Sequence, residues 1–187
     1  MIYRKTTKET LAESLRELSE SKSIDKITIR EIVENCGMSA GTFYNHFKDK
    51  YDLIAWIYLN QMESITKEYL EQENGWLSSL TALLRVVNKD HIFYKNALKN
   101  TAGQNSFFEA ASQRSIELMR DVIRERKGAD LTKEEEFDIL FYLKGFGYCI
   151  EAWIVQGLPY TEEELAGYLS RTIPVNISSY LGEKQGQ

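Results

Sequence analysis

The fold of this chain is decided between residues 27 and 50, by the stretch ITIREIVENCGMSAGTFYNHFKDK. Its beginning has the form of a helix start, because Thr28 and Glu31 have the spacing of a capping box, in which each side chain bonds the backbone N–H of the other residue. The helix that they begin should end at Asn35. Gly37 follows, and glycine readily adopts the left-handed conformation that terminates helices.

A second short helix is expected over residues 39–46, with Ser39 as its N-terminal cap. Its first turn holds small residues, which permit close approach to the edges of bases, and two hydroxyl groups, which can bond phosphates or bases. Two short helices joined by a glycine-containing turn form a helix-turn-helix, although ordinary helical hairpins show the same pattern. The pattern alone leaves DNA binding and a plain hairpin equally open.

Residues 37–50, GMSAGTFYNHFKDK, resemble the DNA-binding signature of the TetR/AcrR family of one-component transcriptional regulators. The resemblance extends over about residues 8–55 and implies that 39–46 is the recognition helix, which enters the major groove of double-stranded DNA. It implies DNA contacts for ten residues: Thr28, Arg30, Ser39, Ala40, Gly41, Thr42, Tyr44, His46, Lys48 and Lys50.

Within that set the resemblance implies different tasks. Thr28, Tyr44 and Lys50 would contact phosphates, and residues 39–42 would lie nearest the bases. Arg30 stands where some relatives read a base, and a bidentate contact between arginine and guanine contributes about 1–3 kcal/mol of discrimination.

Two further residues of the set flank the recognition helix. Lys48 lies near the start of the next helix and could meet the same DNA strand. His46 either contacts a phosphate or makes a structural hydrogen bond. Phe43 and Phe47 are expected to pack into a small N-terminal core.

Hydrophobic periodicity of 3.6 residues runs through nearly the whole chain and period-2 alternation never persists, which predicts an all-α fold of about nine helices. We expect a helix-turn-helix DNA-binding domain at 1–50 and a helical effector-binding and dimerisation domain at 51–187. Pro174 should kink or break the last helix. The expected helices lie at about 6–21, 28–35, 39–46, 49–72, 76–88, 89–100, 105–126, 132–156 and 161–180.

The distribution of charge limits how the chain can bind DNA. The 187 residues carry a net charge of −5. Residues 1–60 hold nine Lys/Arg and nine Asp/Glu, so the rest of the chain carries the whole deficit. A nonspecific polybasic binder is thereby excluded, and any DNA binding must depend on a few placed cations in the N-terminal third.

Catalysis and metal chemistry find no support in the sequence. Cys36 and Cys149 are too few for a disulfide framework or a cysteine-based zinc site. The two histidines, His46 and His91, have no recognisable nucleophile or carboxylate motif nearby. A phosphate loop and a dinucleotide fingerprint are also missing, so we expect neither an enzyme nor a cofactor nor a metal site.

Export and membrane insertion are likewise not expected. The N-terminus lacks the apolar stretch of a signal peptide. The most apolar run, residues 139–155, carries Lys144 and Glu151, whereas a bilayer span needs about 20 mostly uncharged residues. These features predict a cytoplasmic protein without a membrane partner.

Aromatic residues concentrate in the second domain, where 18 of the 22 follow residue 50. Each either packs in the core or lines a pocket. The family resemblance implies an unidentified small-molecule effector between these helices. The candidate pocket residues are Trp56, Trp76, Phe93, Phe107, Phe108 and Phe141.

The expected helix at 132–156 is apolar on two faces, and such a helix must be covered on all sides. One face, formed by Tyr142, Gly145, Cys149 and Ala152, suits a partner subunit. The alternative is a helix that is simply central to a monomer. In the TetR/AcrR family the last two helices of each chain form a homodimeric four-helix bundle, so the resemblance implies a homodimer.

Residues 141–166 also resemble the C-terminal type found in regulators labelled dihydroxyacetone-kinase regulators. The expected function is a ligand-responsive, homodimeric transcriptional regulator, in the first place a repressor, that binds a palindromic operator. The alternative is a TetR-like interaction adaptor or co-regulator without specific DNA binding. The sequence gives neither the effector nor the operator, the regulated genes or the sign of regulation.

Overall fold

The computed structural model describes residues 5–72, 75–100, 107–157 and 159–182. Over these ranges the chain forms helices and connecting turns without a strand, which confirms the predicted all-α fold. No helix in the described ranges is both long and apolar enough to cross a bilayer. Ten α-helices occur in the described part, one more than expected, because the last predicted helix divides at Pro174.

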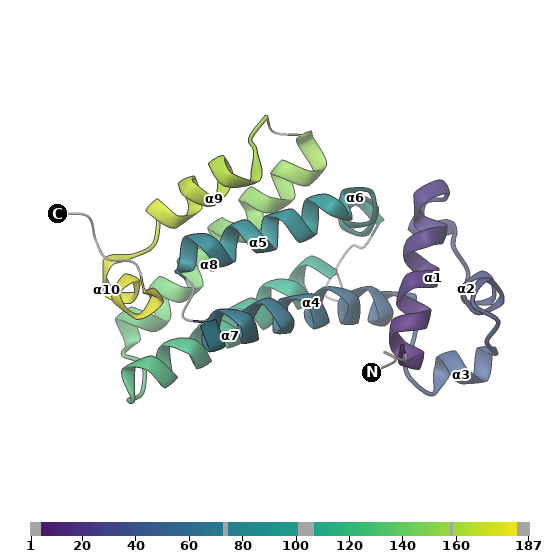
Figure 1. Ribbon diagram of the computed structural model, residues 1–187, viewed down its shortest axis with the longest axis horizontal. Coiled ribbons are helices and arrows are strands. Elements are labelled where there is room, and N and C mark those ends of the chain that lie inside the picture. Colours follow the sequence, from purple (N-terminus) through teal and green to yellow (C-terminus); the bar gives the residue numbers. More distant parts are fainter. Residues whose placement is uncertain (1–4, 73–74, 101–106, 158, 183–187) are drawn as a thin grey trace.

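The helices follow one another along the chain as Figure 1 shows. The α-helices are α1 (Thr7–Ser21), α2 (Ile29–Asn35), α3 (Ala40–Tyr44), α4 (Lys50–Gln72), α5 (Trp76–Lys89), α6 (His91–Asn100), α7 (Phe107–Lys127), α8 (Lys133–Ala152), α9 (Glu162–Arg171) and α10 (Val175–Ser178). Three shorter segments complete the described chain: 3-10 helices η1 (Ile24–Lys26) and η3 (Ser179–Leu181), and the π-helical turn η2 (Trp153–Gly157).

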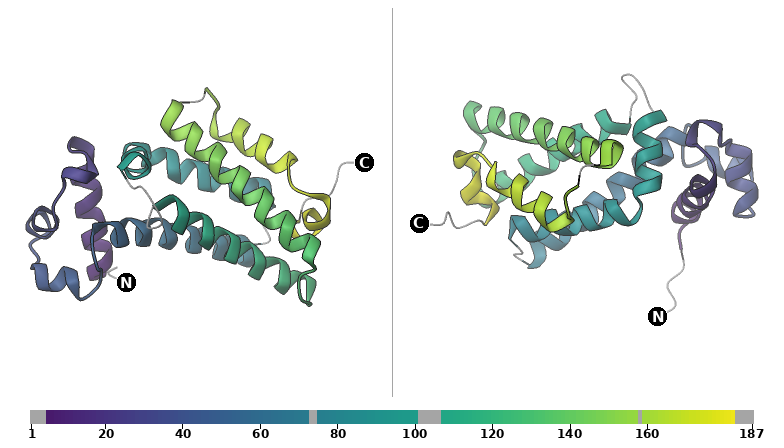
Figure 2. Two further views of the ribbon diagram at one scale, coloured as in Figure 1. Left: turned by 180° about the vertical axis from the view of Figure 1, so that it is seen from behind. Right: turned by 90° about the horizontal axis from the view of Figure 1, so that it is seen from above.

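Helices α1, α2 and α3 form a small N-terminal lobe at one end of the molecule, and α10 lies at the other end (Figures 1 and 2). The long helix α4 leads from this lobe into a bundle in which it packs against α5 and α7. In the bundle α7 also packs on α8, and α5 packs on α9. Helix α3 and the bundle are thus connected through α4.

The N-terminal lobe has its own apolar core. Leu11, Leu15, Ile32 and Phe43 have no solvent-exposed surface, and Phe47 is 3% exposed. The predicted burial of the two phenylalanines is confirmed. Their rings lie 5.8 Å apart and pack between the two helices of the motif and α1.

A second contact joins this lobe to the bundle, between α1 and α6. The Asn96 side chain donates to the Ser19 carbonyl at 3.2 Å. The Arg16 guanidinium lies 3.3 Å from the Asp90 carboxylate and 5.9 Å from the Phe93 ring. Helix α6 therefore touches the N-terminal lobe directly, in addition to the covalent connection through α4.

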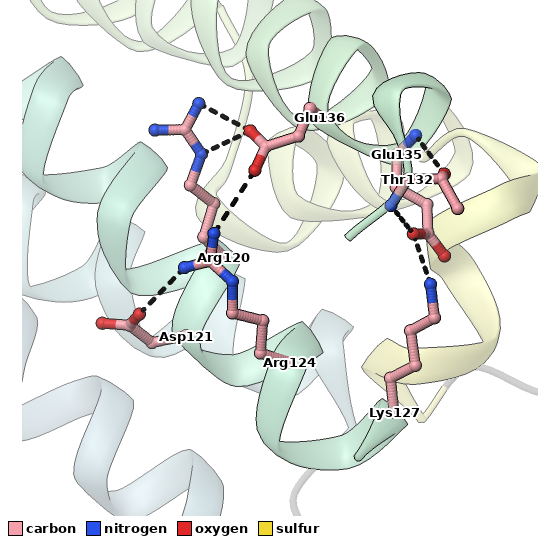
Figure 3. A network of polar contacts seen from close by, with 7 residues as sticks. All are labelled: Arg120, Asp121, Arg124, Lys127, Thr132, Glu135 and Glu136. Atoms are coloured by element: carbon pink, nitrogen blue, oxygen red, sulfur yellow. Dashed lines mark hydrogen bonds and ion pairs between the residues drawn. The ribbon is translucent and has the colours of Figure 1, made fainter. Parts of the chain in front are cut away.

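The turn between α7 and α8 is fixed by ion pairs (Figure 3). Glu136 accepts from Arg120 at 2.7 Å and from Arg124 at 3.4 Å, and Lys127 donates to Glu135 at 2.6 Å. Thr132 caps α8 in the predicted capping box. These bonds join the two helices at one end and so set the direction in which α8 crosses the bundle.

Candidate nucleic-acid interface

The N-terminus of α2 has the predicted capping box. The Thr28 hydroxyl accepts from the Glu31 N–H at 3.2 Å, and the Glu31 carboxylate accepts from the Thr28 N–H at 2.9 Å. Lys22 also donates to Glu31, at 2.5 Å. The lysine first, and then the bonds from Thr28, lower the pKa of Glu31 from 4.5 to about 2. The start of α2 is therefore fixed by bonds of Glu31 to Thr28 and to Lys22.

Three polar bonds, of which the one between Ser14 and Ile32 is buried, fix α2 against α1. The Ser14 hydroxyl donates to the Ile32 carbonyl at 2.6 Å, and the Asn35 side chain donates to Ser14 at 3.1 Å and to Glu17 at 3.0 Å. At the end of α2, Gly37 has a φ of 68°, as its place in the turn predicts. The helix-turn-helix thus rests on α1 in a defined orientation.

The first turn of α3 presents a small, open surface. Ser39 caps the helix by accepting from the Thr42 N–H at 3.1 Å, and the two hydroxyl oxygens lie 2.9 Å apart. Ser39, Ala40 and Gly41 are exposed, and Thr42 is half-buried. A methyl group added at Gly41 would meet only the Ser39 hydroxyl, at 3.6 Å. No bulky side chain of the turn itself stands between its backbone and an approaching base.

Polar side chains surround this turn. Tyr44 is 58% exposed and lies edge-on to the buried Phe43 ring, which supports it at a centroid distance of 5.6 Å. Lys48 and His46 are exposed. The His46 ring makes no hydrogen bond to the described part of the chain, so the structural bond considered for it is not present there. A phosphate contact stays the prediction for this residue.

Arg30 points outward from α2 with 84% of its side chain exposed. Its Nε donates to the Glu34 carboxylate at 2.7 Å, and this bond raises the pKa of the guanidinium. Exposed ion pairs of this kind are weak. Arg30 can therefore exchange its partner for a base or phosphate at small cost.

Lys50 has a different environment from the one predicted. Its ammonium donates to the Ile24, Asp25 and Ile27 carbonyls at 2.7, 2.7 and 2.8 Å, and partial burial lowers its pKa. An ammonium has three N–H groups, so none is left for a phosphate in this conformation. We therefore replace the predicted phosphate contact of Lys50 by a structural role, in which α4 is bonded to η1 and to the entry of α2.

Two cavities lie among the described helices of the bundle. The first, of about 60 Å³, lies among α4, α5, α7 and α8 and is lined by Trp76 among other residues. The second, of about 50 Å³, lies among α4, α5, α6, α7 and α8, and both Phe107 and Phe108 line it. Three of the six predicted pocket residues thus border these cavities.

The other three predicted pocket residues lie elsewhere. Trp56 borders a polar depression beside α1, where Lys8 Nζ lies 5.7 Å from its ring. Phe93 is 3% exposed and packs at the contact between α1 and α6. Phe141 is 70% exposed on the outer side of α8. The presence of an aromatic residue therefore does not tell whether its position lies in the core, on the surface or in a pocket.

The predicted partner face of α8 is also corrected. Tyr142 is 5% exposed, donates to the Leu169 carbonyl at 3.0 Å and accepts from Trp76 Nε1 at 3.1 Å, so it belongs to the interior of its own bundle. Ala152 is buried as well, Cys149 is half-buried and only Gly145 is exposed. The predicted stripe faces mainly inward.

The exposed apolar stripe of α8 lies on its other side. Phe137, Leu140, Phe141 and Tyr148 are 63, 42, 70 and 65% exposed, and their spacing places them with Gly145 on one helical face. The rings of Phe137 and Phe141 stack at 6.0 Å. Lys144 lies among these side chains on the same face and is 43% exposed. A group of exposed large apolar side chains with a charged neighbour is typical of a protein–protein interface.

Among the described residues no group of three or more His, Cys, Asp or Glu side chains lies close enough together to hold a metal ion. The exposed Tyr44, His46 and Lys48 instead follow an open, small-residue turn. This arrangement is suited to a polyanion with accessible edges, which is the surface that duplex DNA offers in its major groove.

Comparisons with known proteins match both parts of the chain. A family model described as bacterial regulatory proteins of the tetR family matches residues 6–57, and one described as a transcriptional regulator C-terminal region matches residues 74–174. The HTH-type dhaKLM operon transcriptional activator DhaS of Lactococcus lactis subsp. lactis is 27% identical over 89 residues. That match covers 48% of this chain and 47% of the relative, so it spans about half of the relative's length.

Solved structures share the fold. The dihydroxyacetone kinase operon activator DhaS has a TM-score of 0.66 and 22% identity, over 92% of this chain and 97% of its own. The Thermus thermophilus repressor FadR, solved with lauroyl-CoA, has a TM-score of 0.58 and 18% identity, over 96% of each chain. At these identities the likeness concerns the fold alone.

Proposed function

The chain belongs to the TetR family of bacterial regulatory proteins, and on this premise we propose that it binds a palindromic operator as a homodimer and releases it in response to a small molecule. One observation carries the DNA contact: the open first turn of α3 is followed by the exposed Tyr44, His46 and Lys48, on a lobe in which polar bonds join α2 to α1. A preorganised binding surface loses little conformational freedom on binding.

Nine of the ten predicted DNA contacts are retained in this proposal, and Lys50 is removed because its ammonium is saturated. Residues 39–42 would face the bases. Thr28, Tyr44, His46 and Lys48 would bond phosphates. Arg30 would leave Glu34 to read one base pair, in accordance with its exposure.

The exposed stripe of α8, formed by Phe137, Leu140, Phe141, Gly145 and Tyr148, supports the dimer. A second copy would cover these side chains, and an isologous dimer brings the same face of each subunit together. In such a dimer two recognition helices enter successive major grooves about 34 Å apart, which requires a palindromic site.

Ligand control follows from the two cavities in the bundle. A molecule bound there changes DNA affinity only by the difference between its affinities for the DNA-bound and the released conformation. The Thermus thermophilus FadR structure holds lauroyl-CoA, which shows that a protein of this fold takes up a ligand with an apolar chain. For this chain the sign of regulation is proposed as repression, whereas the partial relative DhaS is an activator.

The test is a fluorescence-anisotropy titration with DNA from upstream of the protein's own gene against scrambled DNA, at about physiological salt. Nanomolar, sequence-specific binding with two subunits per site supports the proposal. A folded protein that prefers no genomic fragment contradicts it and favours an adaptor that acts through partner proteins. In vitro transcription from the bound promoter then decides between repression and activation.

A further inference from the structure

The second cavity contains a buried hydroxyl group without a partner. Ser112, on α7, is 8% exposed and lines this cavity, and its Oγ makes no hydrogen bond within the described chain. Buried polar groups are nearly always paired, because leaving one unpaired costs about 1–3 kcal/mol. An unpaired group of this kind beside a cavity is placed to bond an incoming molecule.

The walls around Ser112 are aromatic and uncharged. The Tyr58 and Phe107 rings meet edge to face at 5.3 Å, and the Tyr94 ring lies 6.0 Å from Phe107. Burial raises the pKa of both tyrosines, and a phenol with the ordinary pKa of about 10 is already protonated at neutral pH. The Tyr58 hydroxyl lies 3.4 Å from that of Ser115. These rings pack directly against one another, so they form an aromatic wall of the cavity, and the Ser112 and Ser115 hydroxyls belong to the same lining.

Charge restricts the ligand further. Among the described lining residues of both cavities, Glu151 is the one with a formal charge at neutral pH, and it is half-buried at the second cavity. Its carboxylate disfavours an anion, and no lining cation compensates the desolvation of a carboxylate or phosphate group. The cavity is thus suited to an uncharged molecule.

The two cavities are neighbours, because Ser115, Leu143 and Phe146 line both of them. Their volumes are about 60 and 50 Å³, which is small for an organic ligand when each is taken alone. For the two cavities to form one elongated space, these shared side chains would have to move. The end of that space in the second cavity would carry Ser112 and most of the aromatic rings, and the end in the first cavity would be mainly aliphatic, with Met62 and Leu83 beside Trp76.

We propose that the joined cavity binds an uncharged, mostly apolar molecule with an aromatic ring whose hydroxyl or carbonyl oxygen bonds Ser112, and whose alkyl substituent extends into the first cavity. Simple alkylphenols have this chemistry. The proposal rests on the proposed function insofar as this molecule is the signal that releases DNA, but its test measures ligand binding without DNA.

The experiment titrates the purified protein with 4-propylphenol and with propylbenzene and follows intrinsic tryptophan fluorescence, to which Trp76 in the first cavity contributes. Ser112→Ala removes the hydroxyl, and Ser79→Ala, in the first cavity, removes a matched hydroxyl away from it. We expect Ser112→Ala to weaken the binding of 4-propylphenol about fivefold to tenfold, which corresponds to the loss of one hydrogen bond. Binding of propylbenzene should stay unchanged in both variants.

A second variant narrows the cavity without touching Ser112. A Cβ atom at Gly147 would lie 3.3 Å from the Phe108 ring, so Gly147→Ala adds a methyl group to the lining of the second cavity and displaces this lining ring by a few tenths of an ångström. The change suits a helix, in which alanine is favoured over glycine. Gly147→Ala should weaken the binding of 4-propylphenol, while its thermal unfolding stays cooperative. If Ser112→Ala does not fold, this variant tests whether the ligand occupies the second cavity.

Three results overturn the proposal: no saturable binding of 4-propylphenol at millimolar concentration, equal effects of Ser112→Ala and Ser79→Ala, or tighter binding of 4-propylbenzoate or 4-propylbenzylamine than of the phenol. Failure of DNA binding in the separate anisotropy titration overturns the proposed function and leaves this result intact. If ligand binding fails while DNA binding succeeds, the proposed regulatory function stands and only the proposed class of ligand is refuted.

Discussion

Lys50, in the first turn of α4, donates a hydrogen bond to the carbonyl of Ile27, the residue directly before the cap of α2, at a distance of 2.8 Å. With its two further bonds to η1, this lysine joins the helix that leads to the bundle with the start of the helix-turn-helix. The connection between the two parts of the molecule is thus polar and specific at this point.

The first prediction follows from that bond. Lys50→Met leaves three carbonyl groups without this partner and should lower the free energy of unfolding by about 1–3 kcal/mol, measured by urea denaturation. The salt dependence of DNA binding should keep its slope. In Lys48→Met, the matched control, the slope of log K against log salt should fall by about 0.9, because an exposed phosphate contact is lost. A reduced slope in Lys50→Met would return this residue to the DNA interface.

The second prediction concerns pH. The folded-state pKa of Glu31 is lowered from 4.5 to about 2, chiefly by Lys22, so the ionised carboxylate stabilises the fold above pH 4.5. That contribution is lost as the pH falls from 4.5 toward 2. Glu31→Gln should therefore lower the urea midpoint at pH 7, and the difference from the unchanged protein should shrink at pH 3. Glu20→Gln, an exposed position on α1, controls for lost charge; the same pH dependence there would contradict the assignment.

The third prediction tests the interior position of Tyr142. Its hydroxyl pairs with Trp76 and with the Leu169 carbonyl, and Tyr142→Phe leaves these buried groups short of a partner. We expect a loss of about 1–3 kcal/mol in chemical denaturation with an unaltered oligomeric state. Dissociation into monomers without loss of monomer stability would restore Tyr142 to the subunit interface.

The fourth prediction tests the exposed stripe of α8. Phe141→Asp introduces a charge next to the stacked Phe137 ring, and burying an unpaired charge is costly. Sedimentation velocity should show monomers at micromolar concentration. Ile92→Asp, at a position on α6 that is 45% exposed, should leave the sedimentation coefficient as it is. If both variants sediment like the unchanged protein, the dimer uses another face.

The fifth prediction concerns base recognition. Arg30→Ala should relax the preference at one base pair of each half-site, with a loss of about 1–3 kcal/mol of discrimination, as measured by sequencing of selected oligonucleotides. Glu34→Ala removes only the partner of the arginine and should keep the preference. If Arg30→Ala selects the same DNA sequences as the unchanged protein, Arg30 does not contact a base.

The local features of the fold could be predicted because their causes lie within a few residues. Thr28 and Glu31 are three positions apart, and Pro174 breaks a helix through its own ring and missing N–H. Lys50 could not be predicted in the same way, since its carbonyl partners lie 23 to 26 residues earlier in the chain. Only the folded arrangement of α4 against η1 brings them together.

The partner face of α8 shows a second limit. Phe141 and Tyr142 are adjacent in sequence and both aromatic, but an α-helix separates their side chains by about 100° around its axis. The predicted partner stripe around Tyr142 is mainly covered by its own bundle, and the exposed side chains around Phe141 form a further stripe that the periodicity did not single out. Which stripe the bundle covers depends on where Trp76 and Leu169 lie, which only the tertiary structure provides.

Helix α6 lies between the second cavity and α1, and this position affects how the effector can be found. Tyr94 and Leu98 line the second cavity, while Phe93 and Asn96 of the same short helix touch α1. If the ligand and DNA each require a different position of this helix, binding of one changes the affinity for the other. The factor of change in affinity is the same in both directions. Operator DNA should then weaken ligand binding as strongly as the ligand weakens DNA binding, so a screen for the effector can be read from either side.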